Sequence, residues 1–428
     1  MERAEITEET VALAREAART DPATSLPELA VTLQRFSFRA RDRTLAERTA
    51  LVAEAADIYR RLLDGGAEAH RLSAAYALGS LAQRYSLAHA DDRALATRRE
   101  AAELARHLPS EPLRAGEVVG PGNGFKASLA FALAEAGELD EAVVLLRDVT
   151  DAYRAAAPEG EFWVVWGMIE LVAMLGPAGR TGESLDVERE GVDRMRQDPR
   201  RLPHSPGVAL REAGAALWFA AAGRSEEAHR FLGDALKSSE QLPPEGSIAD
   251  FGFLESFRAS LFARSGVRDE PAVSGEPVPG PVPAPALRPV LGVSFHHWSF
   301  SLRESFRAGL GDLDRAVEAA TAEPEGTGSP TWPTDPARLA ELGTLLRRRN
   351  VRRAVLRDEH PYSYHEVTLP NLQRSVDLER RLHEADPATT DRLVRALTDL
   401  AMAQLVVGAN TAATGTLREA HALATASG

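Results

Sequence analysis

The chain has 428 residues, of which 44% are hydrophobic and only 6% aromatic, and its net charge is −13. This length exceeds what one compact core normally serves, so it predicts two blocks or an extended repeat array. The absence of cysteine excludes disulfides, thiol nucleophiles and Cys-ligated metal sites, and the acidic balance argues against nonspecific nucleic-acid binding.

The beginning of the chain argues against export. The stretch MERAEITEETVALAREAART carries acids where a signal peptide needs a basic and then an apolar run. Nowhere does an apolar stretch approach the ~18 residues of a membrane span. We therefore expect a soluble, cytoplasmic protein without membrane contact. Apolar residues recur at helical rather than alternating spacing, which predicts an all-α fold.

One helix-start signal recurs along the chain. Asp21-Pro22, Asp335-Pro336 and Asp386-Pro387 each combine an N-cap acid with a proline suited to the first helical position. Each pair comes before Ala and a Leu-bearing amphipathic run. The recurrence predicts boundaries between repeated units.

The clearest unit is residues 124–157, which reads as a helix, a tight turn and a second helix. Gly137 closes the first helix in a conformation that only glycine adopts at little cost, and Ala142 lets the second helix pack closely. The same five-residue spacing returns three more times, as Gly223 with Ala228, Gly311 with Ala316, and Gly408 with Ala413. We expect a hairpin at each of these four positions.

This pattern resembles the tetratricopeptide repeat (TPR). The small residue that the family places seven positions before the glycine is present as Ala130, Ala216 and Ala401, whereas the third copy has Glu304. The resemblance implies an α-solenoid of stacked antiparallel helical hairpins forming a TPR-like superhelix, with about seven to eight hairpins. Related motifs starting at Asp42 and Asp92 lie further apart than the ~34 residues of a minimal repeat, as in the long-helix repeats of actinobacterial proteins.

A proline-rich stretch interrupts the repeats. Between residues 270 and 290, EPAVSGEPVPGPVPAPALRPV, seven of 21 residues are proline, so neither a helix nor a strand persists there. We expect this stretch to be a connector between an N-terminal helical repeat block, residues 1–269, and a C-terminal block, residues 291–428.

A stack of hairpins leaves a long concave groove suited to a peptide or a partner protein. We expect a noncatalytic scaffold or adaptor that uses this groove. The TPR pattern implies groove-facing residues in the first helices, and two tryptophans of first-helix segments are further anchor candidates. The expected partner-binding residues are Ala127, Phe131, Trp166, Ala213, Leu217, Trp298, Thr398 and Met402.

Two other functions stay open. TPR arrays in bacteria often sense peptides or gate an attached effector, so a regulator that acts through a separate partner is the first alternative. The second is a metal-dependent enzyme that uses the loop 358–366, where His360 and His365 lie among carboxylates. Without a zinc-protease or nucleophile motif, we assign no catalytic, metal or cofactor residue.

Three further features of the sequence carry weaker signals. The glycine-rich stretch before Lys126 lacks the order of glycine, lysine and hydroxyl that a phosphate loop needs, so it predicts only the entry to a helix. The arginines between 347 and 357 could meet phosphate or an acidic partner, but a face paired with the chain's own acids is the simpler interpretation. The terminal helix, 417–424, lacks a strongly polar outer face, so a homodimer is possible.

Overall fold

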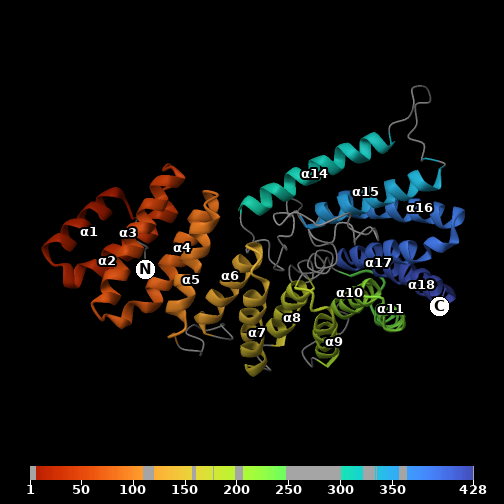
Figure 1. Cartoon of the computed structure of the whole chain (residues 1–428), viewed down its shortest axis with the longest axis horizontal. Coiled ribbons are helices and arrows are strands. Elements are labelled where there is room, and N and C mark those ends of the chain that lie inside the picture. Colours follow the sequence, from red (N-terminus) through yellow and green to blue (C-terminus); the bar gives the residue numbers. More distant parts are fainter. Residues whose placement is uncertain are drawn as a thin grey trace. The chain divides into compact units, whose positions relative to one another are not determined.

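The computed structural model of the chain describes residues 6–108, 120–156, 161–176, 178–197, 206–246, 300–321, 333, 335–355 and 364–427. Over these ranges the chain forms helices and turns, and none of them contains a β-strand (Figure 1). The expected all-α class is therefore confirmed. The helices divide between two compact units, and each unit is described here by itself.

The first unit holds residues 1–133, 144–160 and 299–302. From α1 to α5 each helix packs on the next one along the chain. Leu33, Val52, Tyr59 and Leu78 lie in the core between them and are almost fully buried. The helices are α1 (Glu8–Thr20), α2 (Pro22–Arg39), α3 (Leu45–Asp64), α4 (Arg71–Leu87), α5 (Asp91–Ala105) and most of α6 (Pro121–Glu135), and α7 (Leu139–Ala155) lies across the division between the units.

The helix starts follow the sequence signals. The Asp21 carboxylate accepts a hydrogen bond from the amide of Thr24, and Pro22 occupies the first helical position. Asp335 and Asp386 receive equivalent bonds, from the amides of residues 337 and 388. The prediction that Asp-Pro pairs begin helices is confirmed. Helix α3 begins instead with a capping box, in which the Thr44 and Glu47 side chains each bond the other's backbone amide.

Three of the four predicted glycine turns are present. Gly137, Gly223 and Gly408 have φ of +87°, +73° and +79°, in the left-handed region that residues with a Cβ rarely enter. The fourth prediction is wrong, because Gly311 lies inside the uninterrupted helix α14 (Phe300–Thr321). A single glycine costs a helix only ~1 kcal/mol relative to alanine, so one such residue does not by itself break a 22-residue helix.

Ion pairs join equivalent helices of successive hairpins, and the sequence analysis missed them. Arg15 on α1 pairs with Glu54 on α3 at 2.5 Å, and Arg60 on α3 pairs with Glu100 on α5 at 2.6 Å. The paired residues are 39 and 40 positions apart in the chain. This separation is the structural repeat length along the second helices, and it exceeds the ~34 residues of a minimal repeat.

The second unit holds residues 134–143, 161–298 and 303–428. Two runs of packed neighbours form its described part: one from α8 to α11, the other from α15 to α18. Its helices are α8 (Glu161–Leu175), α9 (Thr181–Gln197), α10 (Gly207–Ala221), α11 (Ser225–Glu240), most of α14, α15 (Pro336–Val355), α16 (Leu369–Ala385), α17 (Thr390–Val406) and α18 (Asn410–Ser427).

The two runs meet hairpin against hairpin. Helix α10 packs on α17 and α11 packs on α18. The Thr414 hydroxyl donates to Ser239 at 3.1 Å, whereas His421 lies against Gly233, so residue numbers rise along α18 as they fall along α11. The two helices are therefore antiparallel. One core contains residues from both runs, although their sequences lie on opposite sides of the stretch 270–290.

The antiparallel contact differs from the stacking within a run. Arg189 on α9 pairs with Glu227 on α11, and Arg196 on α9 pairs with Asp234 on α11, each 38 positions later, so α9 and α11 are parallel. Stacked TPR-like hairpins repeat this parallel relation between equivalent helices. The α11 and α18 contact instead places two runs end against end.

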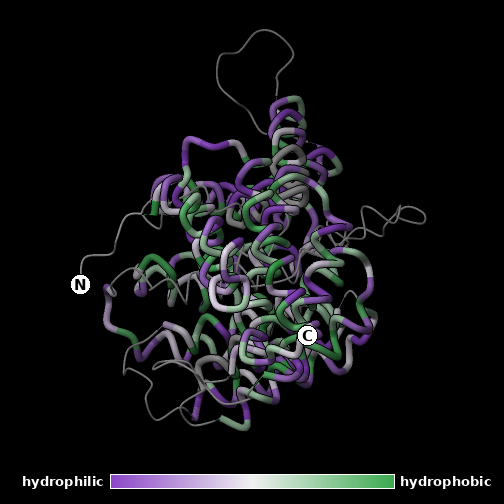
Figure 2. The backbone as a smooth tube through the Cα atoms, turned by 90° about the vertical axis from the view of Figure 1, so that its left-hand side faces the viewer, coloured by the Kyte–Doolittle hydropathy of each residue, from purple (hydrophilic) through white to green (hydrophobic). Residues whose placement is uncertain are grey.

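Hydrophobic and hydrophilic residues are interspersed along the backbone (Figure 2), although α10 is buried along most of its length. None of these helices combines the length and apolar composition needed to span a membrane. The predicted connector 270–290 lies outside the described residues, so the predicted boundary between blocks 1–269 and 291–428 stays a prediction.

Candidate interaction face

Large apolar side chains are exposed on the first helices of the first unit. Phe38 on α2 is 54% exposed and Tyr76 on α4 is 38% exposed. Val31, two helical turns before Phe38, is 36% exposed. We call this surface the aromatic face and define it as Val31, Gln34, Phe38, Tyr76, Ser80 and Phe125. It crosses α2, α4 and α6, all within the first unit.

Side-chain contacts make the aromatic face continuous. Between α2 and α4, the Gln34 amide donates to the Ser80 hydroxyl at 3.4 Å. Between α4 and α6, the rings of Tyr76 and Phe125 meet edge to face with their centroids 5.4 Å apart. Gly79 leaves room for this approach, because a Cβ at that position would lie 3.3 Å from the Phe125 ring.

Helical spacing places these residues on one side. Val31, Gln34 and Phe38 are spaced by three and then four positions, and Tyr76 and Ser80 by four, so each set lies along one stripe of its helix. Residues 34 and 80 pair across α2 and α4, and so do 37 and 84. Because both numbers rise together, α2 and α4 are parallel, as first helices are in TPR-like hairpins.

A buried guanidinium lies beneath Phe38. Arg84 on α4 is only 6% exposed, and its carbon Cζ lies 5.3 Å from the centroid of the Phe38 ring. One of its Nη atoms donates to the Ser37 carbonyl oxygen at 3.1 Å. Burial lowers the pKa of Arg84, and the positive charge of Arg48 lowers it further.

The predicted groove positions in the first unit lie mostly inward. Phe131 on α6 is 1% exposed and lies in the protein interior, while Ala127 on the same helix is half-buried. Phe125, one and a half turns before Phe131, reaches the aromatic face instead. Partner contact at Ala127 and Phe131 stays a prediction.

The predicted groove positions in the second unit lie in its core. Ala213 and Leu217 on α10 share one buried cluster with Met402 on α17. Thr398, also on α17, is 1% exposed, and its hydroxyl donates to the Val394 carbonyl of its own helix. All four residues are therefore buried, and three of them share one cluster. Their contact with a partner stays a prediction.

The tryptophan candidates can be followed only in part. Trp166 lies in α8, and its side chain is outside the described residues, as is the whole of Trp298. Trp218 on α10 fills the core: its indole N–H donates to the Ser184 hydroxyl at 2.8 Å, and its ring lies against Gly176.

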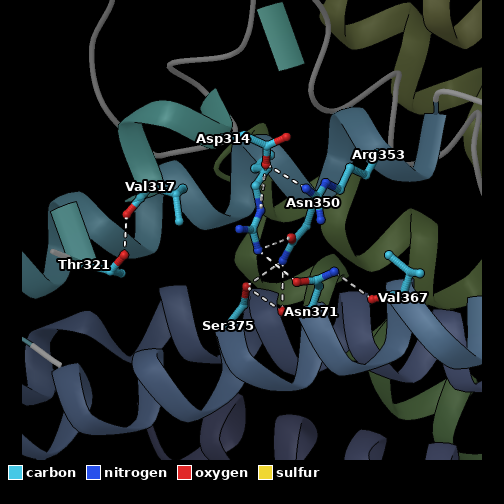
Figure 3. A network of polar contacts seen from close by, with 9 residues as sticks. Asp314, Val317, Thr321, Asn350, Arg353, Val367, Asn371 and Ser375 are labelled. Atoms are coloured by element: carbon cyan, nitrogen blue, oxygen red, sulfur yellow. Dashed lines mark hydrogen bonds and ion pairs between the residues drawn. The ribbon is translucent and has the colours of Figure 1, made fainter. Parts of the chain in front are cut away.

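The arginine run is used internally where the structure describes it. Arg347 pairs with Asp399 at 2.9 Å, and Arg353 pairs with Asp314 at 2.7 Å. Arg349 is buried and donates to the Asn371 side chain at 2.9 Å. Figure 3 shows Arg353 on α15 bonded to Asp314 on α14, and Asn350 on α15 bonded to Asn371 and Ser375 on α16. Pairing with the chain's own acids is confirmed, but the pairs lie between helices instead of on a solvated face.

A polar pocket lies beside this network, between α15, α16 and α17. The Arg392 guanidinium crosses it to grip both oxygens of Glu379 at 2.9 and 3.0 Å and the Ala340 carbonyl at 3.0 Å. Gly343 forms part of the wall, because a Cβ there would lie only 2.6 Å from Glu379. Charged side chains that line the pocket are therefore paired with each other, Arg392 with Glu379 and Arg347 with Asp399.

The other chemical candidates find no support. The glycine-rich stretch enters α6 directly at Pro121, so it forms a helix start and no phosphate cradle, as expected. Within the part of the chain that the structure describes, no three His, Asp or Glu side chains gather closely enough to hold a metal ion. Most of the loop 358–366 lies outside that part, and His365 and Glu366, which lie inside it, are exposed. The absence of catalysis stays a prediction.

Comparisons with known proteins add little to this description. No family model and no curated protein matches the chain. Among solved structures, a complex of Naa15/Naa10 bound to HypK-THB has a TM-score of 0.35 at 14% identity, covering 97% of this chain and 61% of that one. The P58(IPK) TPR domain has a TM-score of 0.20 at 14% identity, covering 94% and 97%. A circular tandem repeat protein with novel repeat topology has 0.22 at 15%, covering 98% and 90%.

These scores are too low to carry an argument about shape or activity, and the chain spans about three fifths of the Naa15/Naa10 chain it matches. The TPR-like character of the repeats rests on the chain's own geometry. The turns from α6 to α7, α8 to α9, α10 to α11 and α17 to α18 each contain a left-handed glycine. Equivalent helices run parallel in the pairs α2 and α4, and α9 and α11.

Proposed function

We propose that the protein is a noncatalytic interaction scaffold whose aromatic face binds a peptide segment of another protein. The observation that carries this proposal is the exposure of Phe38 and Tyr76 on one continuous surface formed by α2, α4 and α6. Exposed aromatic rings on a rigid helical surface supply large contact areas at low entropic cost, which is why such rings dominate binding energies.

The proposal is tested by peptide selection on the full chain. A random peptide library displayed on phage is selected against the wild-type protein and against the double variant Phe38→Ala/Tyr76→Ala. We expect the double variant to weaken binding of the selected peptides at least tenfold, because each truncation removes a contact of about 1–2 kcal/mol.

Leu13→Ala provides the matched control. Leu13 is 65% exposed on α1, a helix that contributes nothing to the aromatic face. The Leu13 variant should bind the selected peptides as the wild type does. If the library yields no peptide, or if the peptides bind the double variant equally well, the proposed function is rejected.

The buried contact of the second unit favours a regulator as the alternative. Ala213, Leu217, Thr398 and Met402, the predicted groove positions, are buried, so a partner reaches them only if the packing of the second unit opens, for example between α10 and α17. A partner that binds them would therefore open the contact, and the chain would gate an effector through this opening. Hydrogen exchange tests this alternative: a selected peptide should speed the exchange of amides on α10 and α17, whereas a passive scaffold should leave it unchanged.

A further inference from the structure

Arg84 is a buried cation for which the described residues provide no carboxylate. It lies below Phe38 with 6% exposure, and its polar contact is the Ser37 carbonyl oxygen at 3.1 Å. A carbonyl dipole compensates a full charge only partly, so burying such a guanidinium is costly unless an anion completes the pair. Arg15 and Arg60, in the same unit, are more exposed and yet each has a glutamate partner.

A second arginine lies close to Arg84. Arg48, near the start of α3, is near enough for its charge to lower the pKa of Arg84. The Nε of Arg48 is buried and, within the described part of the chain, has no hydrogen-bond partner. The two guanidiniums thus repel each other, and neither forms an ion pair with a described carboxylate. A negative charge placed there would relieve both the repulsion and the unmet donor.

The aromatic face is also basic in a chain that is acidic overall. Arg35 and Arg39 lie beside Phe38 on α2, are exposed, and form no ion pair with any described residue. Helices α2, α4 and α6 together contain five basic and only two acidic residues, whereas α3 and α5 contain six basic and eight acidic ones. The basic residues are Arg35, Arg39, Arg71, Arg84 and Lys126, and the acidic ones are Glu28 and Glu135. The helices that form the aromatic face therefore have a positive net charge, whereas that of α3 and α5 is negative.

We propose that the occupant of the aromatic face is an acidic amphipathic peptide segment, one carboxylate of which reaches Arg48 and Arg84 while its apolar side chains lie on Phe38 and Tyr76. This inference rests on the proposed function and names the chemistry of its partner. A carboxylate on a peptide fits a site in which two guanidiniums flank an aromatic ring. A nucleic acid fits less well, because the chain's net charge of −13 repels a long polyanion.

The peptides selected on the wild-type chain supply the first test. We expect them to be enriched in Asp and Glu, with Leu or aromatic residues at helical spacing. One selected peptide is then synthesised together with a version in which Gln replaces every Glu and Asn replaces every Asp. Fluorescence anisotropy with the full chain should show binding at least tenfold weaker for the neutral version, and binding of the acidic version should weaken as salt rises.

Variants of the protein identify the receiving site. Arg84→Met removes the charge and keeps the length, and we expect it to weaken the acidic peptide about tenfold while leaving the neutral version unchanged. Arg19→Met is the matched control, because Arg19 is an exposed arginine on α1 that pairs only locally with Glu16. Circular dichroism checks that both variants fold, and Arg48→Met repeats the test from the second arginine should Arg84→Met unfold.

The outcomes separate the inference from the proposed function. Selected peptides that are neutral or basic, yet depend on Phe38 and Tyr76, overturn the inference and leave the proposed function standing. Acidic peptides that bind the folded Arg84→Met or Arg48→Met variant as tightly as the wild type also overturn it. Single-stranded DNA that competes with the acidic peptide at equal concentration would assign the site to nucleic acid and reject the acidic-peptide inference.

Discussion

At the scale of single residues, Gly343 shows how closely the second unit is packed. The Glu379 and Arg392 ion pair passes directly over its Cα, and an added Cβ would lie 2.6 Å from the Glu379 oxygen and 2.9 Å from Leu378. Neither neighbour can withdraw freely, because Glu379 holds Arg392 through both oxygens and Leu378 is buried. This glycine is therefore required by space and not by backbone conformation.

We predict that Gly343→Ala destabilises the protein by about 1–3 kcal/mol, the usual cost of forcing one carbon into a filled core. Gly415→Ala is the control, since Gly415 lies within α18 and a Cβ there would meet no atom within 4 Å. That substitution should stabilise the helix by about 0.5–1 kcal/mol. Urea unfolding followed by circular dichroism measures both changes, and equal effects of the two substitutions would contradict the packing described for Gly343.

Burial also raises the pKa of one tyrosine, Tyr59. The pKa of Tyr59 is raised above its ordinary 10.0 because its phenol is removed from water, and a hydrogen bond with Ser73 only partly opposes this. Folding therefore favours the neutral phenol. Its contribution to stability is complete below pH 10 and is lost as the pH rises through the folded-state pKa.

Absorbance at 295 nm, which follows tyrosinate formation, tests this shift. The chain has six tyrosines, and we expect the step with the highest pKa to be missing in Tyr59→Phe. The variant should also lose less stability than the wild type between about pH 9 and pH 11, which is about one unit either side of the reference pKa of tyrosine. An unchanged titration curve in the variant would show that Tyr59 does not carry the raised pKa.

Residue patterns in the sequence predicted local structure well and the surface poorly. The turns at Gly137, Gly223 and Gly408 could be predicted because a left-handed turn favours glycine. The prediction for Gly311 was wrong because a glycine inside a helix looks the same in the sequence as a glycine at a turn. The exposure of Phe38 could not be inferred from helical spacing alone, since spacing does not say which stripe of a helix meets a neighbour. One usable signal was missed: α4 contains no acidic residue, although the chain is acidic overall.

At the scale of helices, the long-range arginine pairs set the register of the stack. Arg60 on α3 reaches Glu100 on α5 through two bonds of 2.6 Å, and Arg380 on α16 reaches Glu419 on α18 at 2.7 and 3.1 Å. These pairs are 40 and 39 residues apart. A shift of either helix by one turn would separate the partners by about 5 Å. Their main effect is thus on alignment between hairpins.

Reversing both charges of one such pair tests this. Arg60→Glu and Glu100→Arg should each destabilise the first unit, because each places two like charges together. The double variant should regain most of the loss. The coupling should be no more than about 1 kcal/mol, since both side chains are more than a third exposed and water screens them. A thermal-unfolding double-mutant cycle measures the coupling, and additive losses would show that the pair does not interact in solution.

At the scale of the whole chain, the contact between α11 and α18 joins segments that are far apart in sequence. Ser239 and Thr414 are 175 positions apart, yet their hydroxyl oxygens are separated by 3.1 Å. Helix α18 contains the segment 417–424, from which the homodimer was predicted, and it packs on α11. No local sequence pattern indicates such a contact, because it depends on two distant runs meeting end to end. The homodimer stays a prediction.

Because the chain has no cysteine, this contact can be locked selectively. We predict that Ser239→Cys/Thr414→Cys forms a disulfide under mild oxidation, seen as a faster-moving monomer on a nonreducing gel, and raises stability by about 2–4 kcal/mol. The pair Ser239→Cys/Thr425→Cys should not form it, because Thr425 lies 11 residues further along α18, about 16 Å away. Disulfide formation in both pairs, or in neither, would contradict the contact.

The antiparallel meeting of α11 and α18 has a consequence for how such a chain can lengthen. A stack of like hairpins can be extended by gene duplication at whichever edge is still uncovered. Here the outer edges of two runs cover each other, so an extra hairpin inserted after either run would have to disrupt the contact between them. Tolerated duplications should therefore fall elsewhere in the gene, and lineages that differ in repeat number should keep these two hairpins as an invariant junction.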